Sequence, residues 1–317
     1  MRLIRGLTNL QSLSKQPDSL LRKGCVATIG NFDGVHLGHQ KIIEQVRDRA
    51  ARLKLPSVAM TFEPQPQEFF QGREAPPRLT DFRQKFELLT ESGIDMVLCV
   101  RFDERFRQYP ATAFIEEALL DGLKIQHLVV GDDFRFGHDR SGDFNLLKKV
   151  GLEAGFDVEN TRTVMVKGAR VSSTRVRKAL SENRLDLAAK LLGRPYAIEG
   201  HVVYGRQLGR EIGAPTVNIV LKHMPPLRGV YVVTTEMPDG SHRDGVANIG
   251  LRPTVDGKQP SLEVHLFDFA GTLYGQRLRV TFCHPLRDEV RFDSVDALKS
   301  QIQQDMRAAR AWLASQR

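Results

Sequence analysis

Two histidines, His36 and His39, stand in the glycine-bearing stretch GNFDGVHLGH at residues 30–39. An apolar run precedes this stretch and a helical pattern follows it, which predicts a strand-to-helix turn. Glycines in such a turn let backbone N–H groups approach a phosphate, and the positive end of the helix dipole adds to the attraction. Imidazole donors there can hold the α- and β-phosphates of a nucleotide and stabilise the charge that develops in an adenylyl transfer.

The same turn carries Asp33, which can orient a donor or take part in binding Mg²⁺. A structural alternative is that Gly30, Gly34 and Gly38 only shape the turn and that the histidines cap the helix at the surface. A lone histidine would favour that alternative. Two histidines beside a glycine at the end of a strand favour the phosphate site.

A second stretch with chemical potential is GRQLGREIGAPTVNIV at residues 205–220. The Thr216 hydroxyl and the Asn218 amide oxygen are hard oxygen ligands, and their spacing puts them on one side of an extended chain. Such ligands suit a Mg²⁺ ion that is shared with nucleotide phosphates. The glycines of this stretch let the backbone wrap a phosphate tail. A plain glycine-rich turn is the structural alternative.

One carboxylate, Glu263, lies in the alternating stretch SLEVHLFDFAGTLYG. Leu262 and Val264 face one way in such a strand, and Glu263 and His265 face the other. A single acid on the polar face of a half-buried strand usually faces solvent. The residues alone therefore do not select Glu263 as catalytic.

The first half of the chain alternates strand-like and helix-like segments. Strands buried on both faces and separated by helices predict a parallel sheet that is covered on each side. Ligands of such folds bind beyond the carboxyl ends of the strands, where GNF and GDDF both fall. The expected strands are residues 25–32, 57–62, 96–102, 127–134 and 164–171, and the expected helices are 39–53, 78–93, 112–123 and 144–155.

After about residue 185 the pattern changes to short β-rich runs broken by glycine, proline and aspartate. This pattern predicts a small antiparallel β-barrel or sandwich, of which we favour the barrel. An amphipathic helix at residues 294–315, capped by Ser294, ends the chain. The expected architecture is α/β: a Rossmann-like nucleotidyltransferase domain at 1–184 and a barrel with a terminal helix at 185–317.

Composition indicates the charge of the ligands and the cellular compartment to expect. The formal net charge is +8, which suits polyanionic ligands, although basic and acidic residues are interleaved and no long basic block occurs. Cys25, Cys99 and Cys283 lie far apart in apolar runs, as expected for thiols of a reducing compartment rather than for a disulfide frame or a zinc site. No apolar run is long enough to span a bilayer, and the N-terminus lacks a secretory signal. We expect a cytoplasmic protein that does not engage a membrane.

With these motifs in view, the first half resembles a known family. GNFDGVHLGH resembles the His-x-Gly-His signature of the nucleotidyltransferase superfamily and, more specifically, the N-terminal module of bacterial bifunctional riboflavin kinase/FAD synthetases. FEPQP at 62–66, VGDDFRFGHDRSGD at 130–143 and VSSTRVR at 171–177 resemble further motifs of that family, in the same order. The hydroxyls and guanidinium of VSSTRVR suit a departing pyrophosphate, although SST alone is typical of a helix cap.

The resemblance implies that this half is an FMN adenylyltransferase. An FMN phosphate oxygen would attack the α-phosphorus of ATP, giving FAD and pyrophosphate, with Mg²⁺ neutralising the phosphates. Many relatives carry asparagine where this chain has Asp133. The implied catalytic residues are His36 and His39, the implied nucleotide-binding residues are Gly30, Phe32, Asp33, Gly38, Ser172, Ser173, Thr174 and Arg177, and the implied flavin-binding residues are Phe62, Pro64, Pro66, Asp132, Phe134 and Arg135.

The second half resembles riboflavin kinases, through its glycine-rich loop and a Pro-Thr-Ala-Asn-like motif. The resemblance implies that Glu263 accepts the proton of the riboflavin 5′-hydroxyl as that oxygen attacks the γ-phosphate of ATP. Thr216 and Asn218 would hold Mg²⁺. Relatives usually have phenylalanine at Ala214 and alanine at Val217, yet we expect kinase activity. The implied nucleotide-binding residues of the kinase are Gly205, Arg206, Gly209, Arg210, Gly213 and Pro215.

The combined expectation is an enzyme that converts riboflavin to FMN and then to FAD, with small-molecule substrates and no nucleic acid. A class I aminoacyl-tRNA synthetase-like enzyme would share the histidine signature, but it predicts a lysine-rich loop where this chain has SSTRVR. A non-catalytic RNA-binding module predicts eroded motifs. The retention of the histidine pair, Thr216, Asn218 and Glu263 counts against that module.

Overall fold

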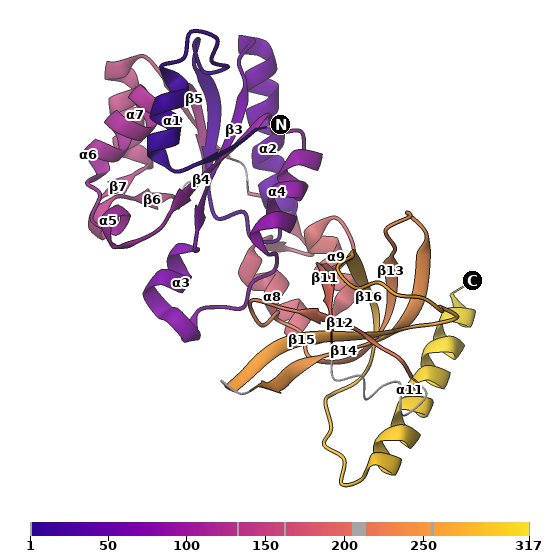
Figure 1. The fold of residues 1–317 in the computed structure, drawn as a ribbon. Helices are drawn as coiled ribbons and strands as arrows, with labels where there is room; N and C mark the ends of the chain where they lie inside the picture. Colours follow the sequence, from indigo (N-terminus) through magenta and orange to yellow (C-terminus); the bar gives the residue numbers. More distant parts are fainter. Residues whose placement is uncertain (1, 132, 162, 205–213, 255–256, 317) are drawn as a thin grey trace. The chain divides into compact units, whose positions relative to one another are not determined.

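In this computed structural model the described residues are 2–131, 133–161, 163–204, 214–254 and 257–316. The chain divides into two compact units (Figure 1). The first comprises residues 1–76 and 82–172, and the second comprises residues 77–81 and 173–317.

The first unit is built on a six-stranded sheet in the order β1-β4-β3-β2-β5-β8, with every neighbouring pair parallel. Its central strands are almost wholly buried, because helices cover both faces of a parallel sheet. This arrangement confirms the predicted Rossmann-like fold. The strands are β1 (Arg2–Arg5), β2 (Cys25–Ile29), β3 (Ser57–Glu63), β4 (Met96–Arg101), β5 (Ile125–Val130) and β8 (Asp157–Asn160).

Two hydrophobic clusters flank the sheet. On one face, α2 (Leu37–Leu53) and α4 (Phe82–Glu91) pack against alternate strand residues, and they lie side by side in Figure 1. On the other face lie α1 (Leu7–Ser14), the π-helical segment η2 (Phe114–Gly122) and α7 (Phe144–Ala154). Shorter segments complete the unit: α3 (Pro66–Gln71), η1 (Gly72–Glu74), α5 (Glu104–Arg107), α6 (Ala111–Ala113), β6 (Arg135–Phe136), η3 (His138–Arg140) and β7 (Gly142–Asp143).

The strand order fixes where a ligand can bind. From the central strand β2 the chain first builds outward through β3 and β4, and then returns to place β5 on the other side of β2. The crevice outside the carboxyl ends of β2 and β5 is therefore the topological switch point of the sheet. The loop that carries His36 and His39 follows β2, and the GDDF segment follows β5.

The strand predicted at residues 164–171 is wrong. Residues Met165–Val166 (β9) and Ala169–Arg170 (β10) pair with each other as a separate antiparallel hairpin. Lys167 and Gly168 between them have φ values of 48° and 73°, the left-handed geometry of a tight hairpin turn. The sixth strand of the sheet is β8, a more polar segment just before this hairpin.

The second unit confirms the predicted barrel. Six antiparallel strands close in the order β11-β12-β15-β14-β13-β16. Two helices precede the barrel, α8 (Ser173–Ser181) and α9 (Leu185–Leu192). The strands are β11 (Ala197–Val203), β12 (Val217–Val220), β13 (Gly229–Glu236), β14 (His242–Thr254), β15 (Gly257–Leu266) and β16 (Arg277–Arg287).

The terminal helix α11 (Val295–Ser315) packs on the outside of the barrel. The predicted cap is present, because the Ser294 hydroxyl accepts a hydrogen bond from the Ala297 N–H at 3.1 Å. Arg287 donates from two guanidinium nitrogens to the buried Asp305 carboxylate at 2.8–3.1 Å, which ties β16 to the helix. Trp312 and Leu313 pack against the barrel.

Candidate active sites

His36 is the N-cap residue of α2. Its backbone is extended, and its Nδ1 accepts a hydrogen bond from the His39 N–H at 3.3 Å. An accepting Nδ1 carries no proton, so the neutral ring holds its proton on Nε2. The cap therefore fixes the tautomer that can donate a hydrogen bond to a ligand oxygen.

The His39 ring stacks on the His36 ring, with 3.7 Å between centroids and 14° between planes. Burial, followed by the charges of His36 and Lys85, holds the pKa of His39 well below its ordinary value. Within the described part of the chain the buried His39 Nδ1 has no hydrogen-bond partner. His39 is therefore neutral at physiological pH, and its ring is stacked at the N-terminus of a long helix.

The turn before α2 is tightly packed. Phe32 and Asp33 are almost fully buried, and the Phe32 ring meets the His39 ring edge-on. A Cβ atom at Gly38 would lie 3.1 Å from two atoms of the His36 ring. Glycine at this position therefore allows the two imidazoles to occupy the helix N-terminus.

The VSSTRVR motif begins beside this turn, since the Val171 carbonyl oxygen would lie 3.6 Å from a Cβ at Gly38. Ser172 closes the first unit, whereas Ser173, Thr174 and Arg177 belong to α8 of the second unit. Arg177 Nε donates to the Pro77 carbonyl oxygen at 2.7 Å within that second unit.

A cavity of about 510 Å³ opens in the first unit near the carboxyl ends of β3 and β4. Of the predicted flavin-binding residues, Phe62, Pro66, Phe134 and Arg135 line this cavity. Pro64 is not one of its lining residues, and Asp132 lies outside the described residues. Asp133, the departure from the family pattern, is exposed and pairs with Arg170 at 3.2 Å.

Most of the cavity wall was not predicted. Six more aromatic side chains line it, and many of them meet edge-to-face at centroid distances below 6.3 Å. Arg107 and Arg140 add positive charge beside Arg135. The aromatic-rich stretch FDERFRQYP at residues 102–110 is the sequence signal that could have identified this wall. The six additional rings are Phe70, Phe102, Phe106, Tyr109, Phe114 and Phe136.

The cavity can accept a flat aromatic ligand that carries an anionic group. Its walls are mostly apolar rings, and planar π-systems pack well against such rings in offset or edge-on geometry. Tyr109 adds a polar atom to the wall, with its hydroxyl hydrogen-bonded to the Glu117 carboxylate. Partial burial and that carboxylate together raise the pKa of Tyr109, so its hydroxyl stays protonated.

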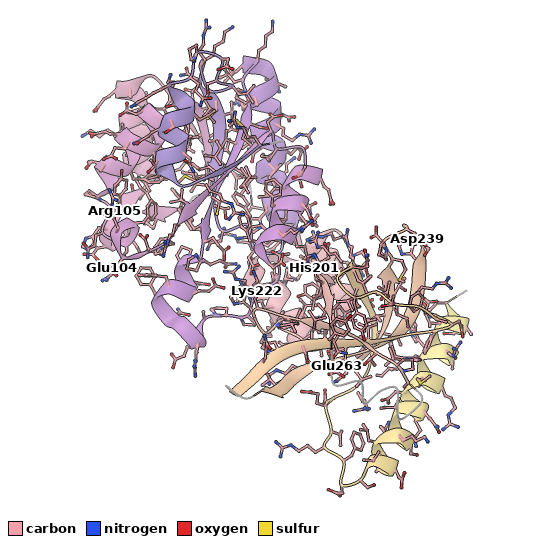
Figure 2. All side chains as sticks on the ribbon, in the orientation of Figure 1. Glu104, Arg105, His201, Lys222, Asp239 and Glu263 are labelled. Atoms are coloured by element: carbon pink, nitrogen blue, oxygen red, sulfur yellow. The ribbon has the colours of Figure 1, made fainter. Side chains whose placement is uncertain are left out.

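The second unit brings Asn218 and Glu263 together through strand register. Asn218 on β12 lies directly opposite Glu263 on β15, and Asn248 on β14 lies opposite Glu263 on its other side. Directly opposed residues have Cβ atoms about 4.5–5.5 Å apart on the same face of the sheet. Asn218 is only 7% exposed, and Figure 2 labels Glu263 on the barrel.

The segment that leads into β12 also contributes to this second site. Pro215 and Thr216 precede β12, and the His265 ring nitrogen Nδ1 hydrogen-bonds the Pro215 carbonyl oxygen at 2.8 Å. Val217 lies opposite Val264, and Ala214 is buried. The predicted nucleotide-binding residues Gly205, Arg206, Gly209, Arg210 and Gly213 lie outside the described residues.

The donor set of the second site suits a hard cation. A hydroxyl, an amide oxygen and a carboxylate are oxygen ligands, which Mg²⁺ prefers. No group of three His, Cys, Asp or Glu side chains that could hold a metal occurs among the residues that the structure describes. Mg²⁺ in proteins commonly keeps water and ligand phosphates in its coordination shell, and these three side chains are compatible with such a shell.

Family models match both halves of the chain. The model described as FAD synthetase matches residues 19–175, and the model described as riboflavin kinase matches residues 192–313.

Curated relatives match along nearly the full length. A bifunctional riboflavin kinase/FMN adenylyltransferase of Pseudomonas fluorescens is 52% identical over 98% of this chain and 97% of its own length. The protein of the same name from Escherichia coli K12 is 49% identical, also over 98% and 97%. The corresponding protein of Haemophilus influenzae is 44% identical over 99% of this chain and its whole length.

A solved structure shares the fold of both halves. A crystal structure from Streptococcus pneumoniae, described as a macrolide-efflux protein, is 29% identical with a TM-score of 0.79 and covers 98% of this chain and 99% of its own. In the part of the present chain that the structure describes, no helix combines the length and apolarity needed to cross a membrane.

Proposed function

The chain belongs to the bifunctional riboflavin kinase/FMN adenylyltransferase family, and from that premise we propose which residues perform its two reactions. The protein phosphorylates riboflavin to FMN with its C-terminal module and transfers an adenylyl group from ATP to FMN with its N-terminal module. In this proposal His36 and His39 serve adenylyl transfer, and Glu263 serves phosphorylation. The domain boundary lies after residue 184, between the two matched ranges.

For adenylyl transfer, His36 and His39 donate hydrogen bonds to the α- and β-phosphates of ATP. The FMN phosphate oxygen attacks the α-phosphorus, the bond to the β-phosphate oxygen breaks, and pyrophosphate leaves. Support comes from the tautomer of His36, whose Nδ1 is occupied by the His39 N–H and whose Nε2 can therefore donate. Fixed donors of this kind stabilise developing charge without having to reorganise. Gly30, Phe32, Asp33 and Gly38 shape the turn, and Ser172, Ser173, Thr174 and Arg177 bind the departing pyrophosphate.

The aromatic cavity binds the flavin ring of FMN. Phe62, Pro66, Phe134 and Arg135 fulfil this role together with the additional rings of the wall, and the volume of about 510 Å³ suits a tricyclic ring system. The arginines at the cavity counterbalance the FMN phosphate. Pro64 and Asp132 complete the flavin side in this proposal.

For the kinase reaction, Glu263 accepts the proton of the riboflavin 5′-hydroxyl, and that oxygen attacks the γ-phosphorus of ATP as ADP leaves. Support comes from the register that places Asn218 directly opposite Glu263. Thr216 and Asn218 would hold Mg²⁺, which neutralises phosphate charge when it is bound. Gly205, Arg206, Gly209, Arg210, Gly213 and Pro215 are proposed to wrap the nucleotide.

We further propose that the enzyme works in the cytoplasm on small molecules, without nucleic acid. The three thiols fit a reducing compartment: Cys25 is buried, and Cys99 and Cys283 are half-buried.

The test of this division is a time course of flavin products. The purified chain is incubated with riboflavin, ATP and Mg²⁺, and riboflavin, FMN and FAD are separated by chromatography. We expect FMN first and FAD afterwards. The double variant H36A/H39A should accumulate FMN, and Glu263→Ala should make FAD only when FMN is supplied. Loss of both activities in either folded variant contradicts the division.

A further inference from the structure

Lys85, in the first half of α4, is a fully buried charged side chain. Lysine is almost never buried completely unless a partner or a function compensates for the lost hydration of its ammonium group. The spacing of α4 predicts Phe82, Phe86 and Leu89 as the buried face, but both phenylalanines are only half-buried. The buried positions of the helix are Gln84, Lys85, Leu88 and Leu89, of which Lys85 and Leu89 have no exposed surface.

Lys85 lies close to the histidine pair. Helices α2 and α4 cover the same face of the sheet (Figure 1). The charge of Lys85 contributes to the lowered pKa of His39 and opposes the raised pKa of Cys99 on β4. Helix α4 leads directly into β4 and covers the same sheet face as α2, so Lys85, in the first half of α4, lies toward the carboxyl ends of the strands, where α2 begins.

The strand register shows which residues of β3 and β4 face these helices. Ala59 and Val97 pair across β3 and β4 and belong to the cluster that α2 and α4 cover. Thr61 and Cys99 also pair, two residues further along, and therefore face the same side. Glu63 continues that row at the end of β3, and its carboxylate is close enough to Cys99 to raise the pKa of that thiol.

We propose that Lys85 is a positioning residue for adenylyl transfer, a fixed buried cation on α4 that raises the positive potential where the ATP phosphates bind beside His36 and His39. This inference rests on the assignment of His36 and His39 to the ATP site. A proton on the buried His39 Nδ1 would be a donor without an acceptor in the described part of the chain, at a site that already contains an ammonium. Burial is the main reason that the pKa of His39 is lowered, and the charges of His36 and Lys85 lower it further, so the neutral ring keeps a single N–H donor.

The same ammonium acts on the reaction. In a poorly solvated site its attraction for growing negative charge on the phosphate oxygens is much stronger than in water. Because the helix holds the ammonium in place, the stabilisation requires no rearrangement during transfer. The ionisable groups that surround His39 and its neighbours in this unit are His36 on α2, Asp33 in the turn, Lys85 on α4, Glu63 on β3, Cys99 on β4 and Arg5 on β1.

The test compares Lys85→Met, which removes the charge, with Lys85→Arg, which retains it. FAD formation from FMN and ATP is measured with the full chain, and kcat and KM are followed from about pH 5 to about pH 9, a range that spans histidine titration. We expect Lys85→Met to lower kcat by about 10–100-fold, with a smaller change in KM for FMN. Lys85→Arg should recover most of the lost kcat.

The pH profile separates electrostatics from packing. Loss of the positive charge raises the pKa of His39, so His39 gains its proton at a higher pH. The acid limb of kcat/KM should therefore move to higher pH in Lys85→Met but not in Lys85→Arg. Leu88→Ala is the matched control, because it weakens packing on the same helix and keeps the charge; it should lower the melting temperature and leave the profile in place.

An unchanged kcat and profile in Lys85→Met overturns the proposal. So does an equal loss in both Lys85 variants without a shifted acid limb, because that result indicates packing alone. If Lys85→Met does not fold, Lys85→Gln is measured against the same outcomes. If H36A/H39A retains FAD synthesis, the assignment of the histidines to the ATP site is wrong. If the histidine pair is essential but Lys85→Met leaves kcat and the pH profile unchanged, only the role of Lys85 is wrong.

Discussion

The two units assemble their candidate sites in different ways. In the first, the key groups are close in sequence: His36 and His39 share one turn, and a helix cap fixes their geometry. In the second, Asn218 and Glu263 are far apart in the chain, and the register between β12 and β15 brings them together. Local sequence therefore specifies the histidine pair almost alone, whereas the pairing of Asn218 with Glu263 depends on correct closure of the barrel.

The ionisable groups of the two sites also differ, and each set suits the nucleophile of its own reaction. His36 is buried and His39 is half-buried, and the pKa of His39 is lowered, so His39 supplies a neutral donor and no positive charge. That suits adenylyl transfer, because an FMN phosphate is already ionised and needs no general base. The second site has a carboxylate, which suits a hydroxyl nucleophile that must lose its proton. If this comparison is right, substitutions in one unit should leave the other reaction intact.

The largest expected effect is loss of FAD synthesis in the double variant H36A/H39A. Removing one preorganised donor typically costs about 10²–10³ in rate, so loss of both should cost on the order of 10⁴ or more. FMN formation from riboflavin should remain near the unsubstituted rate. Rates from FMN and from riboflavin, measured separately, check this. A substantial decrease in FMN formation would mean that the two sites are not independent.

A comparable effect, with the opposite selectivity, is expected for Glu263→Gln. The amide cannot accept the hydroxyl proton, so riboflavin phosphorylation should decrease by about 10²–10⁴. Conversion of supplied FMN to FAD should not change. Asp239→Asn, an exposed carboxylate in the turn between β13 and β14, is the control and should affect neither reaction. Residual phosphorylation above a tenth of the original rate would exclude Glu263 as the base.

A moderate effect is expected for Phe134→Ala in the aromatic cavity. Its ring lines the cavity and stacks on Phe136 at a centroid distance of 5.5 Å. Loss of one aromatic contact with the flavin should cost roughly 1–1.5 kcal/mol, or about tenfold in KM for FMN. Phe69→Ala is the matched control, because Phe69 packs on Phe70 and Phe102 of the same cluster without being a lining residue. An equal increase in both variants would point to the cluster as a whole rather than to a flavin contact.

The sequence predicted the fold because its periodic patterns coincide with burial. The strand CVATI is buried at every position, as a central parallel strand requires, and the Ser294 cap was visible in the sequence. The prediction of a strand at 164–171 is wrong because Lys167 and Gly168 adopt left-handed backbone conformations, which reverse the chain direction. Hydrophobicity could not reveal the polar edge strand β8, whose place in the sheet depends on its pairing with β5.

The site residues also differ in how far the sequence could predict them. Motifs identified the residues that lie near one another in sequence, but most of the aromatic wall comes from segments without a motif, and folding alone brings those segments together. Lys85 was missed for a related reason. Sequence patterns treat lysine as a surface residue, and only the packing of α4 against the sheet shows that it is buried.

The smallest expected effects test whether the units are also independent in stability. Ser294 caps α11 in the second unit, and Asp143 caps α7 in the first by accepting the Leu146 N–H at 2.9 Å. Replacing either cap by alanine should cost about 1 kcal/mol, or roughly 2–4 °C in the melting temperature of its own unit. After stepwise heating, Ser294→Ala should lose kinase activity earlier and Asp143→Ala should lose adenylyltransferase activity earlier. If each substitution shifted both losses equally, the units would unfold as one cooperative body, and their separation would be confined to chemistry.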